Sequence, residues 1–159
     1  ARITPDGNTK VHFVPTIANT AAPTVAEIGA GTELTPQLTP AGLDTPDEGQ
    51  EADSSDLSSA RDKTVPSTIS GQPQGEFYRD DSADTAWTAL PRLTAGYLVI
   101  SRFGGSGASK AIAATDSVEV WTVRVSNRNN VRIARGETLR FQVNFALTDD
   151  PVYAAIVAA

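Results

Sequence analysis

Apolar and polar side chains alternate most regularly near the C-terminal end of the chain, over residues 138–147. Apolar residues occupy every second position there, and the positions between them are polar, Arg140 among them. Since successive side chains of a β-strand point to opposite faces, this period of two predicts a strand with one buried face. The side chains predicted to be buried are Leu139, Phe141, Val143, Phe145 and Leu147.

The other segments in the last third of the chain also have hydrophobic patterns and residue types typical of β-strands. Residues 95–103 contain three successive apolar residues, which is typical of a strand buried on both faces. Residues 117–126 are rich in Val, Trp and Thr, which strands favour. The remaining predicted elements are tight turns at 127–130 and 135–137, a short strand at 131–134 and a final strand at 152–158.

The first half of the chain predicts shorter elements, because Pro and Gly interrupt it often. Residues 10–17 alternate as a strand would, but Pro15 confines that strand to a sheet edge or ends it early. Short extended pieces are expected at 25–28 and 33–38, and a further strand at 75–79.

Residues 80–90 predict the only helix of the chain. Acidic residues begin the segment, Trp87 and Leu90 fall on one face, and Pro91 ends it. One helix among antiparallel strands with short turns predicts a mainly β fold, an antiparallel sandwich or barrel-like domain with a flanking helix. We expect a single domain over residues 1–159, with an extended arm region at 18–74 and a strand-rich core at 95–157.

Residues 45–63, TPDEGQEADSSDLSSARDK, do not fit a compact core, because Leu57 is their only sizeable apolar residue. Such a segment cannot bury enough apolar area to offset the entropy of ordering it, so we expect a long internal loop that is mobile in the isolated subunit. We further expect this arm to become ordered against an adjacent subunit. The candidate contact residues are Asp44, Asp47, Glu48, Glu51, Asp53, Asp56, Arg61 and Lys63.

The distribution of charge supports contact between regions of opposite sign. The net charge is −6, but residues 27–84 hold thirteen acidic and three basic residues, whereas 90–140 hold eight basic and three acidic ones. This asymmetry predicts contact within a subunit or between copies, although two solvated faces that never meet would have the same composition.

No constellation typical of an enzyme is found in the sequence. The chain has no Cys and one His, His12, so thiolate sites and sites that need two His are excluded. The acidic run does not have the spacing of an EF-hand calcium loop, and the basic residues lack the exposed aromatic residues that usually accompany them in nucleic-acid-binding proteins. We therefore expect no catalytic residues, no metal and no cofactor.

Three pieces of the sequence, in this order, resemble the major tail tube proteins of long-tailed bacteriophages. PTVAEIGAGTELTPQLTPAGL (23–43) is similar to the N-terminal part of that family, which a polar loop follows. DTAWTALPRLTAGYLVISRFGG (84–105) is similar to its helix-then-strand unit. VEVWTVRVS (118–126) with LRFQVNFAL (139–147) is similar to its closing strands. The resemblance spans most of residues 10–157.

The resemblance implies a structural virion protein that assembles into stacked hexameric rings. In that family the rings form a hollow tube through which DNA passes during ejection, and a long loop reaches the neighbouring ring. The implied partners are other copies of the chain, a tape-measure protein and tail terminator or initiator proteins, with DNA only in transit and no membrane. The implied location is the phage tail, assembled in the host cytoplasm. Because tube lumens in the family tend to be acidic, the arginines of the strand-rich third should pair with acids across subunit contacts or face outward.

The sequence is also compatible with a second function, that of a non-catalytic β-sandwich that binds a cell surface or a carbohydrate. Such a module needs a cluster of exposed aromatic side chains. The chain has two Trp, three Tyr and five Phe, and most of these fall at predicted core positions.

Overall fold

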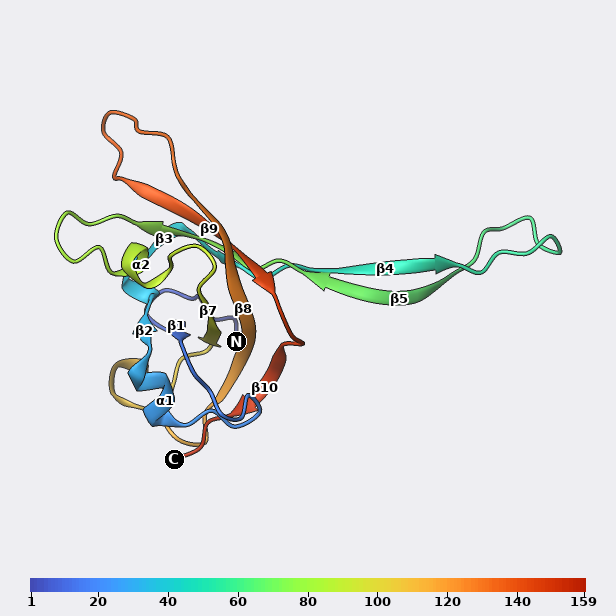
Figure 1. Cartoon of the computed structure of the whole chain (residues 1–159). Helices are drawn as coiled ribbons and strands as arrows, with labels where there is room; N and C mark the ends of the chain where they lie inside the picture. Colours follow the sequence, from blue (N-terminus) through green and yellow to red (C-terminus); the bar gives the residue numbers. More distant parts are fainter.

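The protein, described over residues 1–159 in a computed structural model, is built around one eight-stranded antiparallel sheet (Figure 1). The strand order is β2-β1-β7-β8-β9-β6-β3, and β10 pairs with β8 beside this path. The strands are β1 (Lys10–Val14), β2 (Thr32–Glu33), β3 (Leu38–Asp44), β6 (Gln74–Tyr78), β7 (Ala95–Ser101), β8 (Ser117–Asn130), β9 (Arg140–Leu147) and β10 (Val152–Ile156). The predicted mainly β, antiparallel fold is confirmed.

Two hydrophobic clusters cover the two faces of this sheet. The larger one contains Trp121 and Phe141 with the odd-numbered apolar residues of β8 and β9, and the helix α2 (Thr85–Ala89) packs against it. The smaller one contains Val99 and Val120, and it is covered by β10 and by the helix α1 (Val25–Ala30). Burial on both faces explains the three successive apolar residues of β7, whose neighbours in sequence belong to different clusters.

The segment 25–28, expected to be extended, is helical instead, so the prediction of a single helix is wrong. Thr24 caps α1: its hydroxyl accepts a hydrogen bond from the Glu27 N–H at 3.1 Å, and the Glu27 carboxylate accepts one from the Thr24 N–H at 3.0 Å. This capping box satisfies backbone groups that a short helix leaves without partners. Of the residues expected to be extended at 33–38, only Glu33 of β2 and Leu38 of β3 lie in strands, and a 3₁₀ turn, Thr35–Gln37, lies between them.

The helix predicted at 80–90 is shorter, because α2 begins only at Thr85. Asp84 lies in the left-handed region with φ 45°, which separates the acidic residues before it from the helix. Its carboxylate accepts hydrogen bonds from Arg79 at 2.9 Å and from the Asp80 N–H at 3.1 Å, so residues 79–84 form a closed loop. Leu90 is buried and Trp87 packs edge-on against Phe141, with the ring centroids 5.0 Å apart.

Strand β8 continues through the predicted turn at 127–130, which is therefore wrong. A bulge between Val125 and Asn127 shifts the register, after which β8 pairs with β9 as far as Asn130 opposite Phe141. The predicted strand at 131–134 is instead part of a loop, 131–139. Leu139 lies at the end of that loop and is 55% exposed, so the prediction that it is buried is also wrong.

The segment expected to be a long internal loop is largely a β-hairpin. Strands β4 (Asp47–Asp53) and β5 (Thr64–Gly71) pair antiparallel in a separate two-stranded sheet. This hairpin projects far from the body of the protein, with residues 54–63 at its tip (Figure 1). Neither α1 nor α2 has the length or the apolar character that crossing a membrane requires.

The different burial of Phe141 and Leu139 gives a test of the register of β9. Replacing Phe141, which is fully buried, with Ala should lower the free energy of unfolding by about 3–5 kcal/mol. The matched change Leu139→Ala should lower it by about 0.5 kcal/mol or less, because that side chain is exposed. Urea unfolding of the dilute subunits measures both values, and equal losses would contradict the register.

Candidate assembly surfaces

The hairpin of β4 and β5, called the arm here and comprising residues 47–71, has almost no contact with its own body. All of its residues are exposed except Ser59 and Gly71, which are half-buried. The hydrogen bonds of residues 48–70 remain within the hairpin. A two-stranded hairpin that buries no apolar face is marginally stable in water, so the arm gains little stability from packing within its own chain.

The pairing of β4 with β5 places different side chains on the two faces of the arm. Gly49 lies opposite Ile69 and Glu51 lies opposite Pro66, and residues two apart on β4 share a face. The register shifts between these two pairs because β5 contributes one extra residue there, whereas β4 alternates without interruption. Since Ile69 lies opposite Gly49, it shares the face of Glu51 and Asp53. Ile69 is 71% exposed although it is a large apolar side chain.

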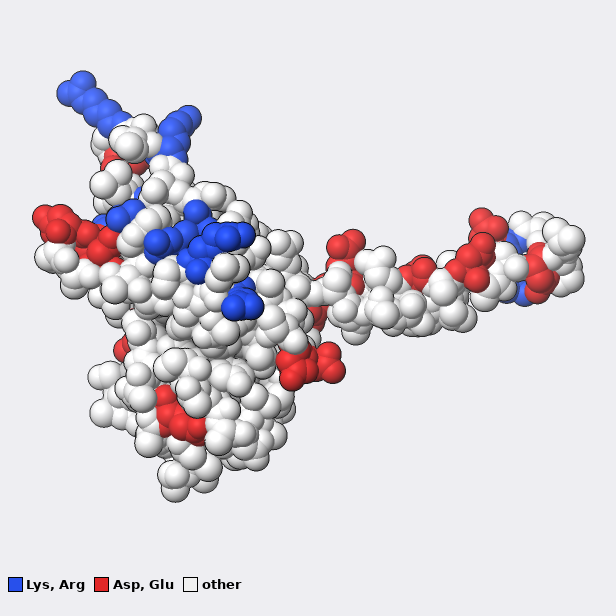
Figure 2. Space-filling model, in the orientation of Figure 1, with Lys and Arg blue, Asp and Glu red and all other residues white.

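The arm contains seven of the eight predicted contact residues, and acidic side chains predominate along it (Figure 2). Four of them lie on β4, Asp56 lies in the tip, Arg61 and Lys63 lie on its return, and Asp44 ends β3. No salt bridge joins an acidic residue of the arm to Arg61 or Lys63. Hydrogen bonds from Ser55 and Ser58 lower the pKa of the Asp53 and Asp56 carboxyls respectively, so both are charged at neutral pH.

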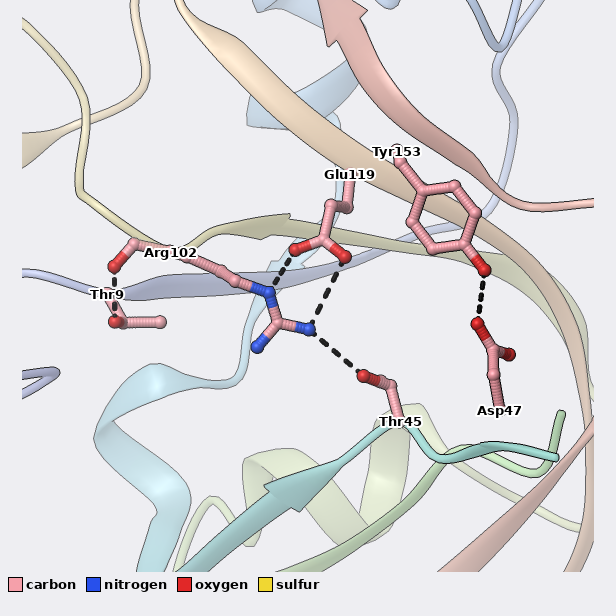
Figure 3. A network of polar contacts seen from close by, with 6 residues as sticks. All are labelled: Thr9, Thr45, Asp47, Arg102, Glu119 and Tyr153. Carbon is pink, nitrogen blue, oxygen red and sulfur yellow. Dashed lines mark hydrogen bonds and ion pairs between the residues drawn. The ribbon is translucent and has the colours of Figure 1, made fainter.

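The base of the arm is attached to the body by two polar contacts (Figure 3). Arg102, just after β7, forms an ion pair with Glu119 of β8 and donates a hydrogen bond to the Thr45 hydroxyl at 3.0 Å. The Tyr153 hydroxyl of β10 donates a hydrogen bond to the Asp47 carboxylate. These contacts join the start of the arm to β7, β8 and β10, and so fix the direction in which the arm leaves the body.

Close packing at the base also requires a glycine. A Cβ on Gly71 would lie 2.9 Å from the Asp47 carboxylate and 3.4 Å from the Leu147 side chain. Sequence reasoning found Asp47 but missed Arg102, Glu119 and Tyr153, because the residues that meet Asp47 and Thr45 are distant in the sequence. No local pattern could have identified them.

The arginines of the body divide into two groups. Arg79, Arg102 and Arg140 pair with acids of the same subunit, and Arg140 lies 2.9 Å from Glu76 and 3.2 Å from Glu137. Arg102 and Arg140 lie in the strand-rich third, so their pairing within the subunit corrects the expectation that the arginines there pair across subunits or face outward. No salt bridge is formed by Arg92, Arg124, Arg128, Arg132 or Arg135.

Trp87 packs against one arginine of each group. The guanidinium of Arg128 lies 3.6 Å from the centroid of the Trp87 ring, and that of Arg79 lies 3.8 Å from it. Arg128 also donates a hydrogen bond to the Trp87 carbonyl at 2.6 Å. Basic side chains gather on the upper part of the body, away from the acidic arm (Figure 2).

The remaining chemistry of the chain is sparse. No group of three or more His, Cys, Asp or Glu side chains is placed to hold a metal ion. His12 lies on β1 between β2 and β7, where burial lowers its pKa, the nearby carboxylate of Glu33 raises it and Lys10 lowers it.

Comparison with known proteins assigns the chain to a class of structural virion proteins. A family model described as phage tail tube protein matches residues 1–159. The chain therefore belongs to the phage tail tube protein family, which confirms the resemblance found in its sequence.

A solved structure gives an independent view of the fold. A chain in the cryo-electron-microscopy structure of the anti-feeding prophage baseplate, sixfold symmetrised, superposes with a TM-score of 0.55 and 8% sequence identity. The match covers 96% of this chain and 95% of that one. No curated protein sequence matches the chain. At this identity the likeness concerns the fold.

The contact between Tyr153 and Asp47 predicts an unusual titration. The hydrogen bond to Asp47, with burial and the negative charge of that carboxylate, raises the pKa of Tyr153 from 10.0 to about 12. The contact therefore stabilises the folded chain fully below pH 10 and is lost as the pH rises through about 12. In an absorbance titration of tyrosinate, Tyr153→Phe should remove a transition near pH 12, and Asp47→Asn should move that transition towards pH 10. A wild-type transition at the ordinary value would contradict the contact.

The exposed arm also predicts a contrast in hydrogen exchange. In the dilute subunit, the amides of β4 and β5 should exchange almost as fast as those of an unfolded peptide, because no packing opposes opening of the hairpin. The amides of β8 and β9, which lie between buried clusters, should be strongly protected. Exchange followed by mass spectrometry measures both, and equal protection would show that the arm has support of its own.

Proposed function

We propose that the chain self-assembles into stacked rings, with six subunits in each, that form the hollow tube of a phage tail. The tube is the conduit through which DNA leaves the capsid, and the subunit itself has no catalytic role. Membership of the tail tube family supports a structural role in the tail. The observation that carries the proposal is the arm, a hairpin that leaves the body and has no partner in its own chain for packing.

The edges of the main sheet are consistent with closure by neighbouring subunits. The sheet ends at β2, which has two residues, and at β3, whose pairing with β6 is interrupted by a register shift between Leu38 and Leu43. Unpaired strand edges promote association with other strands, and closure into a ring removes them. Assembly would therefore satisfy backbone groups that the single subunit leaves exposed.

In this proposal the arm is the contact between subunits. Its acidic residues Asp47, Glu48, Glu51, Asp53 and Asp56, with Asp44, Arg61 and Lys63, contact an adjacent copy. The further partners would be a tape-measure protein inside the tube and terminator or initiator proteins at its ends. The protein would be assembled in the host cytoplasm and remain in the virion.

Shortening the arm tests the proposal. Replacing residues 50–68 with Asn-Gly keeps Thr45, Asp47 and Gly71 at the base, and Asn-Gly forms the tight turn that a two-residue hairpin needs. The shortened subunit should keep its far-ultraviolet circular dichroism and its melting temperature, because residues 50–68 make no contact with the core.

Assembly should be lost in the same variant. Concentrated or seeded wild-type protein should form tubes in negative-stain electron microscopy, whereas the shortened protein should remain monomeric or form isolated rings in sedimentation velocity. Wild-type protein that stays monomeric at millimolar concentration would contradict self-assembly. Normal tubes from the shortened protein would contradict the role of the arm.

A further inference from the structure

We propose that the arm of one copy docks on a surface around Leu93 of a neighbouring copy. This surface, called the Leu93 surface here, consists of Leu93, Arg92 and Arg124. The face of the arm that docks there is the one that carries Ile69, Glu51 and Asp53. The inference rests on the proposed self-assembly and identifies the surface that receives the arm.

Leu93 is held in an unusual position for a large apolar residue. It is 51% exposed and its φ is 71°, in the left-handed region that side chains with a Cβ rarely adopt. Its N–H donates to the Val125 carbonyl at 2.9 Å, and its carbonyl accepts from the Arg124 side chain at 2.9 Å. The backbone is thus fixed in a strained conformation that presents an apolar side chain to the outside, which is typical of a contact site.

The charges around Leu93 are not neutralised within the subunit. Arg92 and Arg124 form no salt bridge, whereas Arg79, Arg102 and Arg140 each do. An exposed leucine with a rim of unpaired arginines therefore needs a partner that supplies an apolar group and carboxylates.

The arm supplies both kinds of group on one face. Ile69 is 71% exposed, Glu51 and Asp53 lie on the same face, and none of the three has a partner in the body. An apolar centre with a charged rim is the usual organisation of a protein interface, and the opposite signs of the two rims favour this pairing. The arm projects away from its own body, so the Leu93 surface that it meets belongs to another copy (Figures 1 and 2).

The loop 131–139 is the alternative receiver, because it exposes Ile133 between Arg132 and Arg135. Two backbone hydrogen bonds, from Val131 to the Arg140 carbonyl and from Glu137 to the Ala134 carbonyl, hold this loop. The backbone of Leu93 is held against β8 by its hydrogen bonds with Val125 and Arg124, so the Leu93 surface offers a fixed position, which binding at low entropic cost requires.

Cysteine cross-linking distinguishes the two receivers, because the chain has no Cys of its own. Single variants Ile69→Cys, Leu93→Cys and Ile133→Cys are each prepared, mixed in pairs under assembling conditions and oxidised. The mixture of Ile69→Cys and Leu93→Cys should give a reducible dimer whose disulfide joins peptides 69 and 93 in mass spectrometry. The mixture of Ile69→Cys with Ile133→Cys, and each variant alone, should give at most a tenth of that yield. Equal or greater yield from the Ile133 mixture would overturn the proposal.

Exchange of charge provides a second test. Glu51→Arg with Asp53→Arg on the arm, or Arg92→Glu with Arg124→Glu on the body, should each reduce the sedimenting tube fraction at least tenfold, and the combination of all four should restore it. Arg92→Gln with Arg124→Gln is the milder variant if the Glu pair does not fold, and it should also reduce assembly. If wild-type tubes form and no charge variant changes them, the inference fails while the proposed function stands. If wild-type protein neither assembles nor cross-links, both fail.

Discussion

The pairing of β8 with three other strands determines most of the architecture. This strand of 14 residues pairs with β7 on one side. On its other side, the first part of β8 pairs with β10 and the later part pairs with β9. Its alternating apolar residues contribute to both hydrophobic clusters, so one strand connects the two halves of the core. The bulge after Val125 then lets β8 continue to Asn130, which places Arg128 against Trp87 and sets where the loop 131–139 begins.

The stability of the chain is distributed unevenly as a consequence. The body buries its large apolar side chains around β8, whereas the arm buries almost nothing and is attached through contacts at Thr45 and Asp47. The charges are divided in a similar way, since some arginines of the body pair locally, while those around Leu93 and the acids of the arm do not. In the proposed assembly, association would pair these charges and cover the exposed edges of the main sheet.

Much of the fold could be predicted from the sequence because burial in a sheet produces a local signal. The alternation in β9 and the apolar run in β7 predicted strands that the structure contains, and the order of short motifs indicated the family. The same local reasoning missed α1, although Thr24 and Glu27 have the spacing of a capping box, because the segment is short and rich in β-branched and small residues. It predicted a turn at 127–130 because a polar turn signal and a bulged strand look alike in one dimension.

The sequence by itself determined that residues 45–63 could not belong to a core, since burial requires apolar side chains that this segment lacks. Only the tertiary structure decided that the segment forms most of a hairpin, and that Arg102, Glu119 and Tyr153 hold its base. Likewise the sequence determined how many charges there are, whereas folding decided which of them pair. The reason is physical: composition and periodicity report what a residue can bury, but contacts between distant residues depend on how the strands are ordered and curved in the sheet.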